Sequence, residues 1–157
     1  MKKILLADDD PAIRETLGEV LVSEEFEVLF AATGREAAAK FATYQPDLVL
    51  LDLNMPDGDG WSAFDLICNA HPSTPVIIIT AISRQYPRAA DLGVDALMEK
   101  PLDIPLLLKT IRNYLAESES ERVHRLTRPD FKTVLLGNSA RNDPQRRTHE
   151  VGEAISK

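Results

Sequence analysis

Acidic residues stand directly after two short apolar stretches of this chain, and a lysine stands after a third. Asp8, Asp9 and Asp10 follow the first stretch, Asp52 follows the second and Lys100 follows the third. Such short apolar stretches predict buried strands. The carboxyl ends of parallel strands share one edge of a sheet, where ligands bind. Carboxylates that meet there repel one another unless a cation lies among them, so the sequence predicts a cation site.

Alternating strands and helices are expected to position these residues. Apolar runs predict strands at residues 4–7, 26–31, 48–51, 75–80 and 94–98. Capping residues and apolar periodicity predict helices that begin at Asp10–Pro11, at a Thr33–Glu36 capping box, near Trp61, near Arg84 and at or beside Asp103. This alternation indicates an α/β fold, a flavodoxin-like doubly wound (βα)5 with a five-stranded parallel sheet in the order 2-1-3-4-5.

Asp8, Asp9 and Asp52 suit a hard divalent cation that keeps several waters, and Mg²⁺ fits best. Each acidic residue alone fits a helix cap or a solvated loop equally well. For Asp10 the cap is the better interpretation, because Pro11 follows it. Three carboxylates at adjacent strand ends have no comparable structural role, since unpaired they would reduce stability.

Lys100 and Thr80 end the fifth and fourth strands and are expected to lie beside the carboxylates. The ammonium could pair with Asp52 or with an anion attached to it, and the bond to Pro101 is a candidate for the cis isomer. The Thr80 hydroxyl could donate to the same anion. Taken alone, the two residues are better explained as a surface lysine and a β-branched strand residue.

Four short segments, in this order and near the expected spacing, resemble the receiver domain of two-component response regulators. They are Asp8–Asp9, Asp52–Gly60, Thr80–Ala81 and Lys100–Pro101. The ordered set is specific to that family, and the resemblance covers about residues 2–117. The chemistry agrees, because an aspartate is a competent nucleophile for an acyl phosphate and phosphoryl transfer depends chiefly on positioning and charge neutralisation.

The resemblance implies a role for each residue of the site. Asp52 would be the phospho-acceptor, and Thr80 and Lys100 would contact the phosphoryl group. Mg²⁺ would be the cofactor, held by Asp8, Asp9, Asp52 and the backbone carbonyl of Asn54. A sensor histidine kinase or phosphotransfer protein would supply the phosphate, and the domain would signal to a downstream protein. It would phosphorylate and dephosphorylate itself without being a turnover enzyme.

Two features depart from the family pattern. Leu97 stands three residues before Lys100, where receivers commonly carry tyrosine or phenylalanine, so the usual aromatic switch is absent. The segment from Thr80 to Gly93 is slightly short and contains Pro87, which fits only the first turn of a helix. We expect a fourth helix that is short or displaced. Because the family usually signals through helix four, strand five and helix five, we also expect a non-standard output face.

Charge and composition narrow the range of partners and compartments. The net charge is −7, so direct DNA binding is not expected. The single cysteine, Cys68, leaves no partner for a disulfide within the chain. Neither a signal peptide nor an apolar segment of membrane-spanning length is visible. These features favour a cytoplasmic protein without membrane contact.

The receiver domain is expected at residues 1–117. Residues 118–157 carry 8 basic and 6 acidic residues, against 10 and 19 in the rest of the chain. They hold too few apolar residues for an independent domain, so we expect an extension of the fifth helix followed by a flexible tail. An extended fifth helix would permit a homodimer.

Two other functions remain open from the sequence. Leu97 and the short fourth helix suggest a receiver-like module that binds its partner independently of phosphorylation. Asp8-x-Asp10 after the first strand also resembles the nucleophile motif of haloacid-dehalogenase-type phosphatases. Against that family, Ala12 stands where a hydroxyl residue is expected, and Asp52 would have no role.

Overall fold

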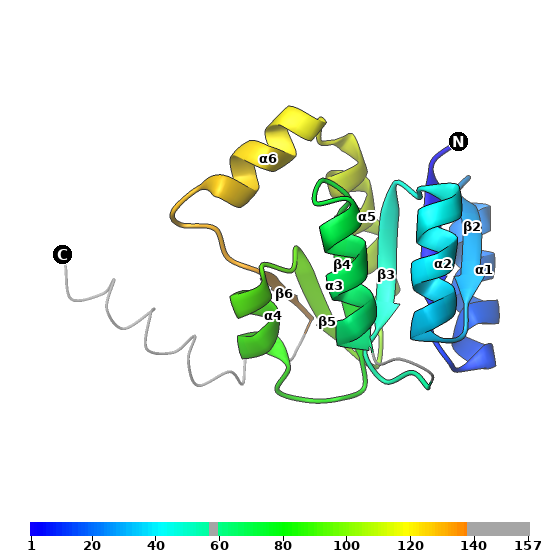
Figure 1. The fold of residues 1–157 in the computed structure, drawn as a ribbon. Helices are drawn as coiled ribbons and strands as arrows, with labels where there is room; N and C mark the ends of the chain where they lie inside the picture. The colour runs from blue at the N-terminus through cyan, green and yellow to red at the C-terminus, as the bar shows by residue number, and fades with distance from the viewer. Residues whose placement is uncertain (57–59, 138–157) are drawn as a thin grey trace.

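The computed structural model describes residues 1–56 and 60–137. One parallel sheet carries helices on both faces (Figure 1). Its strands are β1 (Lys3–Ala7), β2 (Glu27–Ala31), β3 (Leu48–Asp52), β4 (Val76–Thr80), β5 (Ala96–Glu99) and β6 (Val134–Leu136). The helices are α1 (Pro11–Ser23), α2 (Gly34–Tyr44), α3 (Gly60–Ala70), α4 (Tyr86–Leu92), α5 (Ile104–Ala116) and α6 (Glu119–Thr127).

The strand order is β2-β1-β3-β4-β5-β6. The predicted order of the first five strands is therefore confirmed, and β6 is an addition that the sequence did not indicate. The order reverses between β1 and β3, where Ala7 pairs with Leu51. This register brings Asp8, which follows β1, and Asp52, which is the last residue of β3, to the same edge of the sheet.

Side-chain caps fix where the helices begin. Asp10 accepts a hydrogen bond from the Ala12 backbone N–H, so the cap interpretation of this residue is confirmed. Thr33 and Asp103 cap α2 and α5 in the same way. Each such cap stabilises its helix by about 1 kcal/mol. The caps therefore set the points at which the chain leaves the edge of the sheet that carries the acidic residues.

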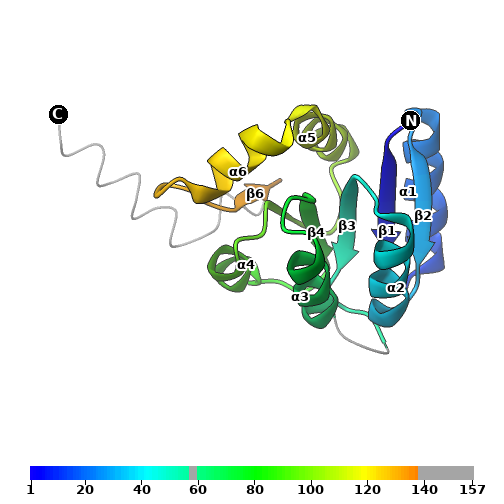
Figure 2. The same ribbon diagram turned by 45° about the horizontal axis from the view of Figure 1, so that its top comes forward.

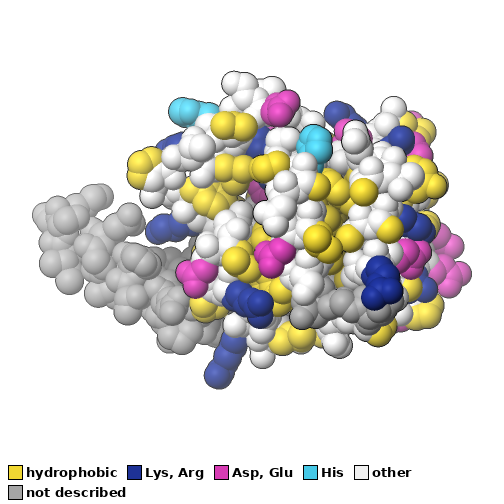
Figure 3. All heavy atoms as spheres, in the orientation of Figure 1, with side chains coloured by type: hydrophobic (Ala, Val, Ile, Leu, Met, Phe, Trp, Pro, Cys, Tyr) yellow, Lys and Arg dark blue, Asp and Glu magenta, His cyan; other side chains and the backbone are white. Residues whose placement is uncertain are grey.

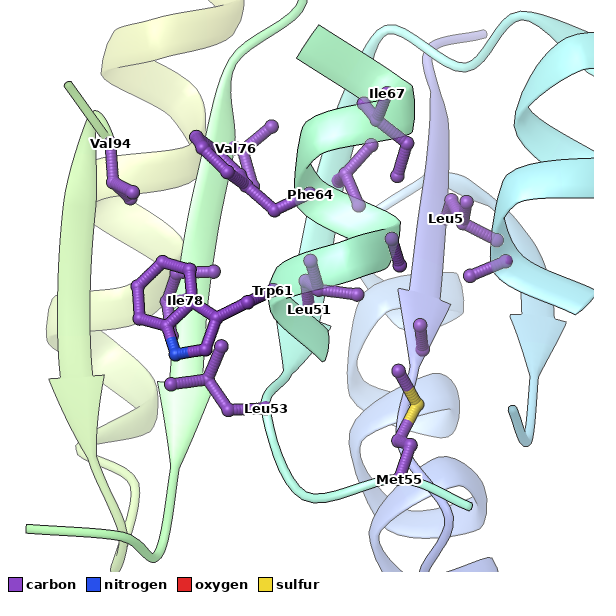
Figure 4. Packing of buried hydrophobic residues seen from close by; sticks show 14 of the residues in the cluster. Leu5, Leu51, Leu53, Met55, Trp61, Phe64, Ile67, Val76, Ile78 and Val94 are labelled. Atoms are coloured by element: carbon purple, nitrogen blue, oxygen red, sulfur yellow. The ribbon is translucent and has the colours of Figure 1, made fainter. Parts of the chain in front are cut away.

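Two apolar clusters cover the two faces of the sheet. One contains residues of α2, α3 and α4, and the other contains residues of α1 and α5. In the first cluster Trp61 and Phe64 extend from α3 over β4, where Val76 and Ile78 lie (Figure 4). Strands β3 and β4 are buried along their whole length, which explains their uninterrupted apolar sequences.

The fourth helix is short, as expected. It has 7 residues, begins with Tyr86 and Pro87 and ends at Leu92, and Gly93 directly after it has a φ of 73°. Proline in the first turn leaves no helix hydrogen bond unmade. Glycine adopts the left-handed conformation at the C-terminal end without steric penalty.

The expected extension of the fifth helix is wrong. α5 ends at Ala116, and Glu117 is extended with a ψ of 135°. Ser118 and Glu121 then form a capping box that begins a separate helix, α6. α6 runs across the end of the sheet and leads to β6 beside β5 (Figure 2). The part of the expected flexible tail from residue 138 onward lies outside the described residues.

The surface of the described part is mixed in character. On the face that carries α3, α4 and α6, hydrophobic side chains lie among charged ones (Figure 3). Within residues 1–56 and 60–137, no helix has the length and apolar character needed to cross a membrane.

Candidate functional site

The carboxylates that follow β1 and end β3 meet at the carboxyl edge of the sheet. The side chains of Asp8 and Asp52 are buried, with residue exposures of 0% and 2%, and Asp9 is exposed. Oxygen atoms from these three carboxylates lie within 4.8 Å of one another. The structure therefore brings together the three side chains that were expected to hold Mg²⁺.

Lys100 reaches the same point from the end of β5. Its Nζ lies 2.8 Å from Asp8 Oδ2 and 3.5 Å from Asp52 Oδ2. The ammonium is thus held more closely by Asp8 than by Asp52, the partner considered from the sequence. The Lys100–Pro101 peptide bond is cis. The Lys100 backbone N–H donates to the carbonyl of Thr80 at 2.7 Å, which ties the end of β5 to the end of β4.

Backbone hydrogen bonds hold the second oxygen of each buried carboxylate. Asp8 Oδ1 accepts from the Asp10 N–H at 2.9 Å, and Asp52 Oδ1 accepts from the Asn54 N–H at 3.1 Å. Arg14 in α1 donates to the backbone carbonyl of Asp8 at 2.7 Å. The sequence had not indicated Arg14, because an arginine six residues after an aspartate is not a recognised pattern. Each carboxylate is therefore oriented with one oxygen toward Lys100.

Burial and charge shift the protonation of the site. Burial raises the pKa of Asp52 to about 6. The hydrogen bond from Asn54 acts in the opposite direction and lowers the pKa, whereas the charge of Asp8 raises it further. Burial by itself would lower the pKa of Lys100, but the hydrogen bond to Asp8 and the charges of Asp52 and Asp8 raise it overall. Lys100 is therefore a cation at neutral pH.

Three carboxylates against one ammonium fit a hard divalent cation. Two of the carboxylates are buried, where uncompensated charge is costly. All the donors are oxygen atoms, which Mg²⁺ prefers, and exposed Asp9 leaves the site open to the water that Mg²⁺ retains. Asn54 lies two residues after Asp52 and remains a predicted ligand through its backbone carbonyl.

Thr80 ends β4 at the same edge and is buried. Its Oγ1 accepts a hydrogen bond from the Ile82 backbone N–H at 3.0 Å. That contact uses a lone pair of the hydroxyl oxygen, so the O–H remains a donor.

Gly60 allows α3 to begin directly against the end of β3. Its N–H donates to the carbonyl of Leu53 at 3.1 Å. A Cβ at this position would lie 2.4 Å from the Leu53 Cα and 2.5 Å from the Asp52 carbonyl oxygen. The backbone around Asp52 therefore has this shape only with glycine at the start of the helix.

Leu97 lies three residues before Lys100, at the position that departs from the family pattern. It is fully buried on β5, in the cluster that contains Trp61 and Phe64. Leu135 of β6 packs against that same cluster. A leucine has no hydroxyl that could exchange between buried and exposed hydrogen bonds, so this position acts here as part of the core.

Comparison with known proteins agrees with this geometry. The family model of the response regulator receiver domain matches residues 4–112. The transcriptional regulatory protein TrcR of Mycobacterium tuberculosis is 30% identical over 156 residues, which are 98% of this chain and 59% of TrcR. The chain thus spans less than two thirds of that relative.

Solved structures give the same result. A CheY-like receiver domain protein from Methanospirillum hungatei superposes with a TM-score of 0.72 at 32% identity, over 77% of this chain and 98% of that chain. The response regulator TrrA of Thermotoga maritima, solved with Mg²⁺-BeF, gives a TM-score of 0.68 at 32% identity, over 73% and 99% of the two chains.

The fold, the position of the acidic cluster and these comparisons lead to the same family. The matched residues 4–112 include every side chain of the site, from Asp8 to Lys100. This chain belongs to the response regulator receiver domains of two-component systems.

Proposed function

We propose that this chain is a phospho-acceptor in which Asp52 takes a phosphoryl group from a phosphohistidine. The donor is a sensor histidine kinase or a phosphotransfer protein. A carboxylate oxygen of Asp52 attacks phosphorus, and the P–N bond breaks with its electron pair leaving on the imidazole. The observation that carries the proposal is the buried Asp52 with Lys100 Nζ at 3.5 Å and two further carboxylates beside it.

The other residues of the site neutralise and position the transferred group. Mg²⁺, held by Asp8, Asp9, Asp52 and the backbone carbonyl of Asn54, supplies neutralisation of phosphoryl oxygens when it is bound. The presence of Mg²⁺ with BeF in the TrrA structure supports this assignment. Lys100 leaves its carboxylate partners to contact a phosphoryl oxygen, and the Thr80 hydroxyl donates to another.

The phosphorylated domain acts in the cytoplasm by binding a downstream protein rather than by turning over a substrate. The cap at Asp10 supports this choice over the phosphatase alternative. Asp10 Oδ1 accepts a hydrogen bond from the Ala12 N–H at the start of α1, so the second aspartate of the phosphatase motif has a structural role here. Direct DNA binding by the described residues is not part of the proposal. A homodimer formed through an extended fifth helix is also left out, since α5 ends at Ala116.

Intact mass measurement after incubation with acetyl phosphate and Mg²⁺ tests the proposal. Wild type is expected to gain one phosphoryl group, and Asp52→Asn to gain none. Asp10→Asn is a matched control, because it changes a neighbouring carboxylate that only caps a helix, and it should still be phosphorylated. EDTA should prevent the reaction.

Other results would favour the alternatives. A wild-type protein that gains no phosphate under these conditions would contradict the proposal and favour the phosphorylation-independent module that Leu97 suggests. Hydrolysis of phosphate monoesters that persists in Asp52→Asn would favour the phosphatase.

A further inference from the structure

Residues 118–137, which comprise α6, β6 and the connection between them, form a clasp across the edge of the sheet at β5. β6 pairs in parallel with β5, with Leu97 opposite Leu135 and Met98 opposite Leu136. Leu135 packs against the cluster on one face of the sheet, and Leu136 belongs to the cluster on the other. The clasp thus contributes to both faces through a strand of only three residues.

A buried ion pair holds the helical half of the clasp. Arg122 in α6 contacts Asp95 through Nη1 at 2.6 Å and Nη2 at 3.0 Å, and its Nη2 also donates to the carbonyl of Thr74 at 2.9 Å. Arg125 adds a contact to Asp95 at 2.9 Å and lies over the ring of Tyr114. Buried ion pairs often add little net stability compared with apolar residues of similar volume. Such an anchor fixes where α6 lies without making the clasp permanent.

The strand half of the clasp is attached to α4. The Tyr86 hydroxyl, in the first turn of α4, donates to the backbone carbonyl of Thr133 at 2.9 Å. The Thr133 hydroxyl contacts the carbonyl of Val94 at 2.6 Å and the carbonyl of Ala89 at 3.3 Å. The start of α4, the end of α4 and the entry to β6 are therefore joined. A change in the position of α4 must change these contacts.

The same helix is connected to the site through the segment that precedes it. Residues 81–85 begin at the contact between Thr80 Oγ1 and the Ile82 N–H, and end directly before Tyr86. Within the segment Arg84 has a φ of 62°, a conformation that side-chain-bearing residues adopt at some energetic cost. A movement of the Thr80 side chain toward an anion on Asp52 would lengthen or break the Ile82 contact. The segment can then relax and shift Tyr86.

We propose that phosphorylation of Asp52 releases the clasp from α4, by shifting the segment between Thr80 and Tyr86 and breaking the contact from Tyr86 to Thr133. The inference rests on the proposed phosphorylation of Asp52 and adds the path by which the conformational change passes from the site to the clasp. Leu97 is a fixed core residue in this path. Tyr86, on α4 and facing the clasp, provides the hydrogen bond that responds.

Hydrogen exchange of the full chain, measured by mass spectrometry with and without acetyl phosphate and Mg²⁺, tests the inference. Phosphorylation is expected to speed exchange of the amides of residues 131–137 by about fivefold, the effect of one net hydrogen bond. Asp52→Asn should show no change with the same reagents. Tyr86→Phe should exchange rapidly in this segment before phosphorylation and change little after it.

Tyr114→Phe is the matched control. It removes another tyrosine hydroxyl, which donates to the carbonyl of Asp95 at 3.1 Å from α5, and it leaves the α4 contact intact. It should keep the wild-type response. A protein shown by intact mass to be phosphorylated, but with unchanged or slower exchange in residues 131–137, would overturn the clasp inference alone. A full response in Tyr86→Phe would also overturn it. Absence of the phosphoryl mass would overturn the proposed function and this inference together.

Discussion

Replacement of Arg122 by methionine is expected to destabilise the protein. Methionine retains most of the apolar stem and loses the guanidinium, which makes two contacts with Asp95 and one with Thr74. The two charged residues are nearly fully buried, with exposures of 5% for Arg122 and 2% for Asp95. The substitution leaves the aspartate inside the protein with a weaker set of partners.

The structure sets the size of this effect. Removing one member of a buried ion pair costs about 3–5 kcal/mol. Asp95 keeps Arg125 at 2.9 Å and the Val76 N–H at 2.9 Å, so the lower value, about 3 kcal/mol, applies. At about 2–4 °C per kcal/mol for a chain of this length, the melting temperature should fall by about 6–12 °C. If the substitution only detached the clasp from an otherwise folded domain, the loss of stability would be smaller, because that loss cannot exceed the free energy with which the clasp docks on the domain.

Urea unfolding followed by the fluorescence of Trp61, the single tryptophan of the chain, measures the loss. Trp61 lies in the cluster under α3, so its signal reports the core. Arg128→Met is the control, since Arg128 pairs with Asp130 on the surface with its side chain 54% exposed. Its loss should stay below about 1 kcal/mol. Equal losses in the two variants, or less than about 1 kcal/mol for Arg122→Met, would refute the argument from burial.

Three further predictions concern the site. Lys100→Met should slow phosphorylation by acetyl phosphate about a hundredfold, measured by intact mass over time, and a rate near that of wild type would contradict its neutralising role. Burial raises the pKa of Asp52 to about 6 in the folded protein, whereas the pKa of an aspartate in the unfolded chain is about 4. Between these two pH values the folded protein therefore binds more protons than the unfolded chain. In EDTA, stability should therefore fall as pH rises from about 4 to about 6, and Asp52→Asn should remove that slope in urea titrations; an unchanged slope would contradict it. Gly60→Ala should lower the free energy of unfolding in urea by about 2–3 kcal/mol, because the added Cβ would collide with backbone atoms. Gly93→Ala should lower it by only about 1 kcal/mol, because the space there is open and only the φ of 73° is unfavourable for alanine. Equal losses in the two variants would contradict the steric argument.

Local patterns were sufficient to predict the first five strands and the grouping of the acidic residues. The apolar runs are short, and charged residues follow the first, third and fifth of them. The caps at Asp10, Thr33 and Asp103 mark the starts of three of the helices. Parallel pairing then requires that the strand ends share an edge. For this reason the amino-acid sequence alone was enough to group Asp8, Asp52 and their neighbours.

The clasp could not be predicted in this way. Arg122 lies in a highly charged segment, which is the usual sequence of a solvated helix face. β6 has three residues, too few to show an alternation. The partner of β6 is β5, which lies far upstream in the sequence, so the formation of β6 depends on tertiary contacts rather than on local preference. One available signal was Asp95, a charged residue inside the apolar run of residues 94–98, because a buried carboxylate requires a cationic or hydrogen-bonding partner.

The sixth strand also determines which part of the sheet could pair with other chains. Without it, β5 would end the sheet, and its apolar residues Ala96–Met98 would present unpaired backbone groups to solvent. Long, apolar open edges are sites of intermolecular β pairing, and proteins commonly close them with short strands. A protein shortened to residues 1–117 is therefore expected to self-associate and precipitate more readily than one that retains residues 118–137. In this chain the segment after the fifth helix is therefore expected to protect solubility, in addition to the signalling role proposed for it above.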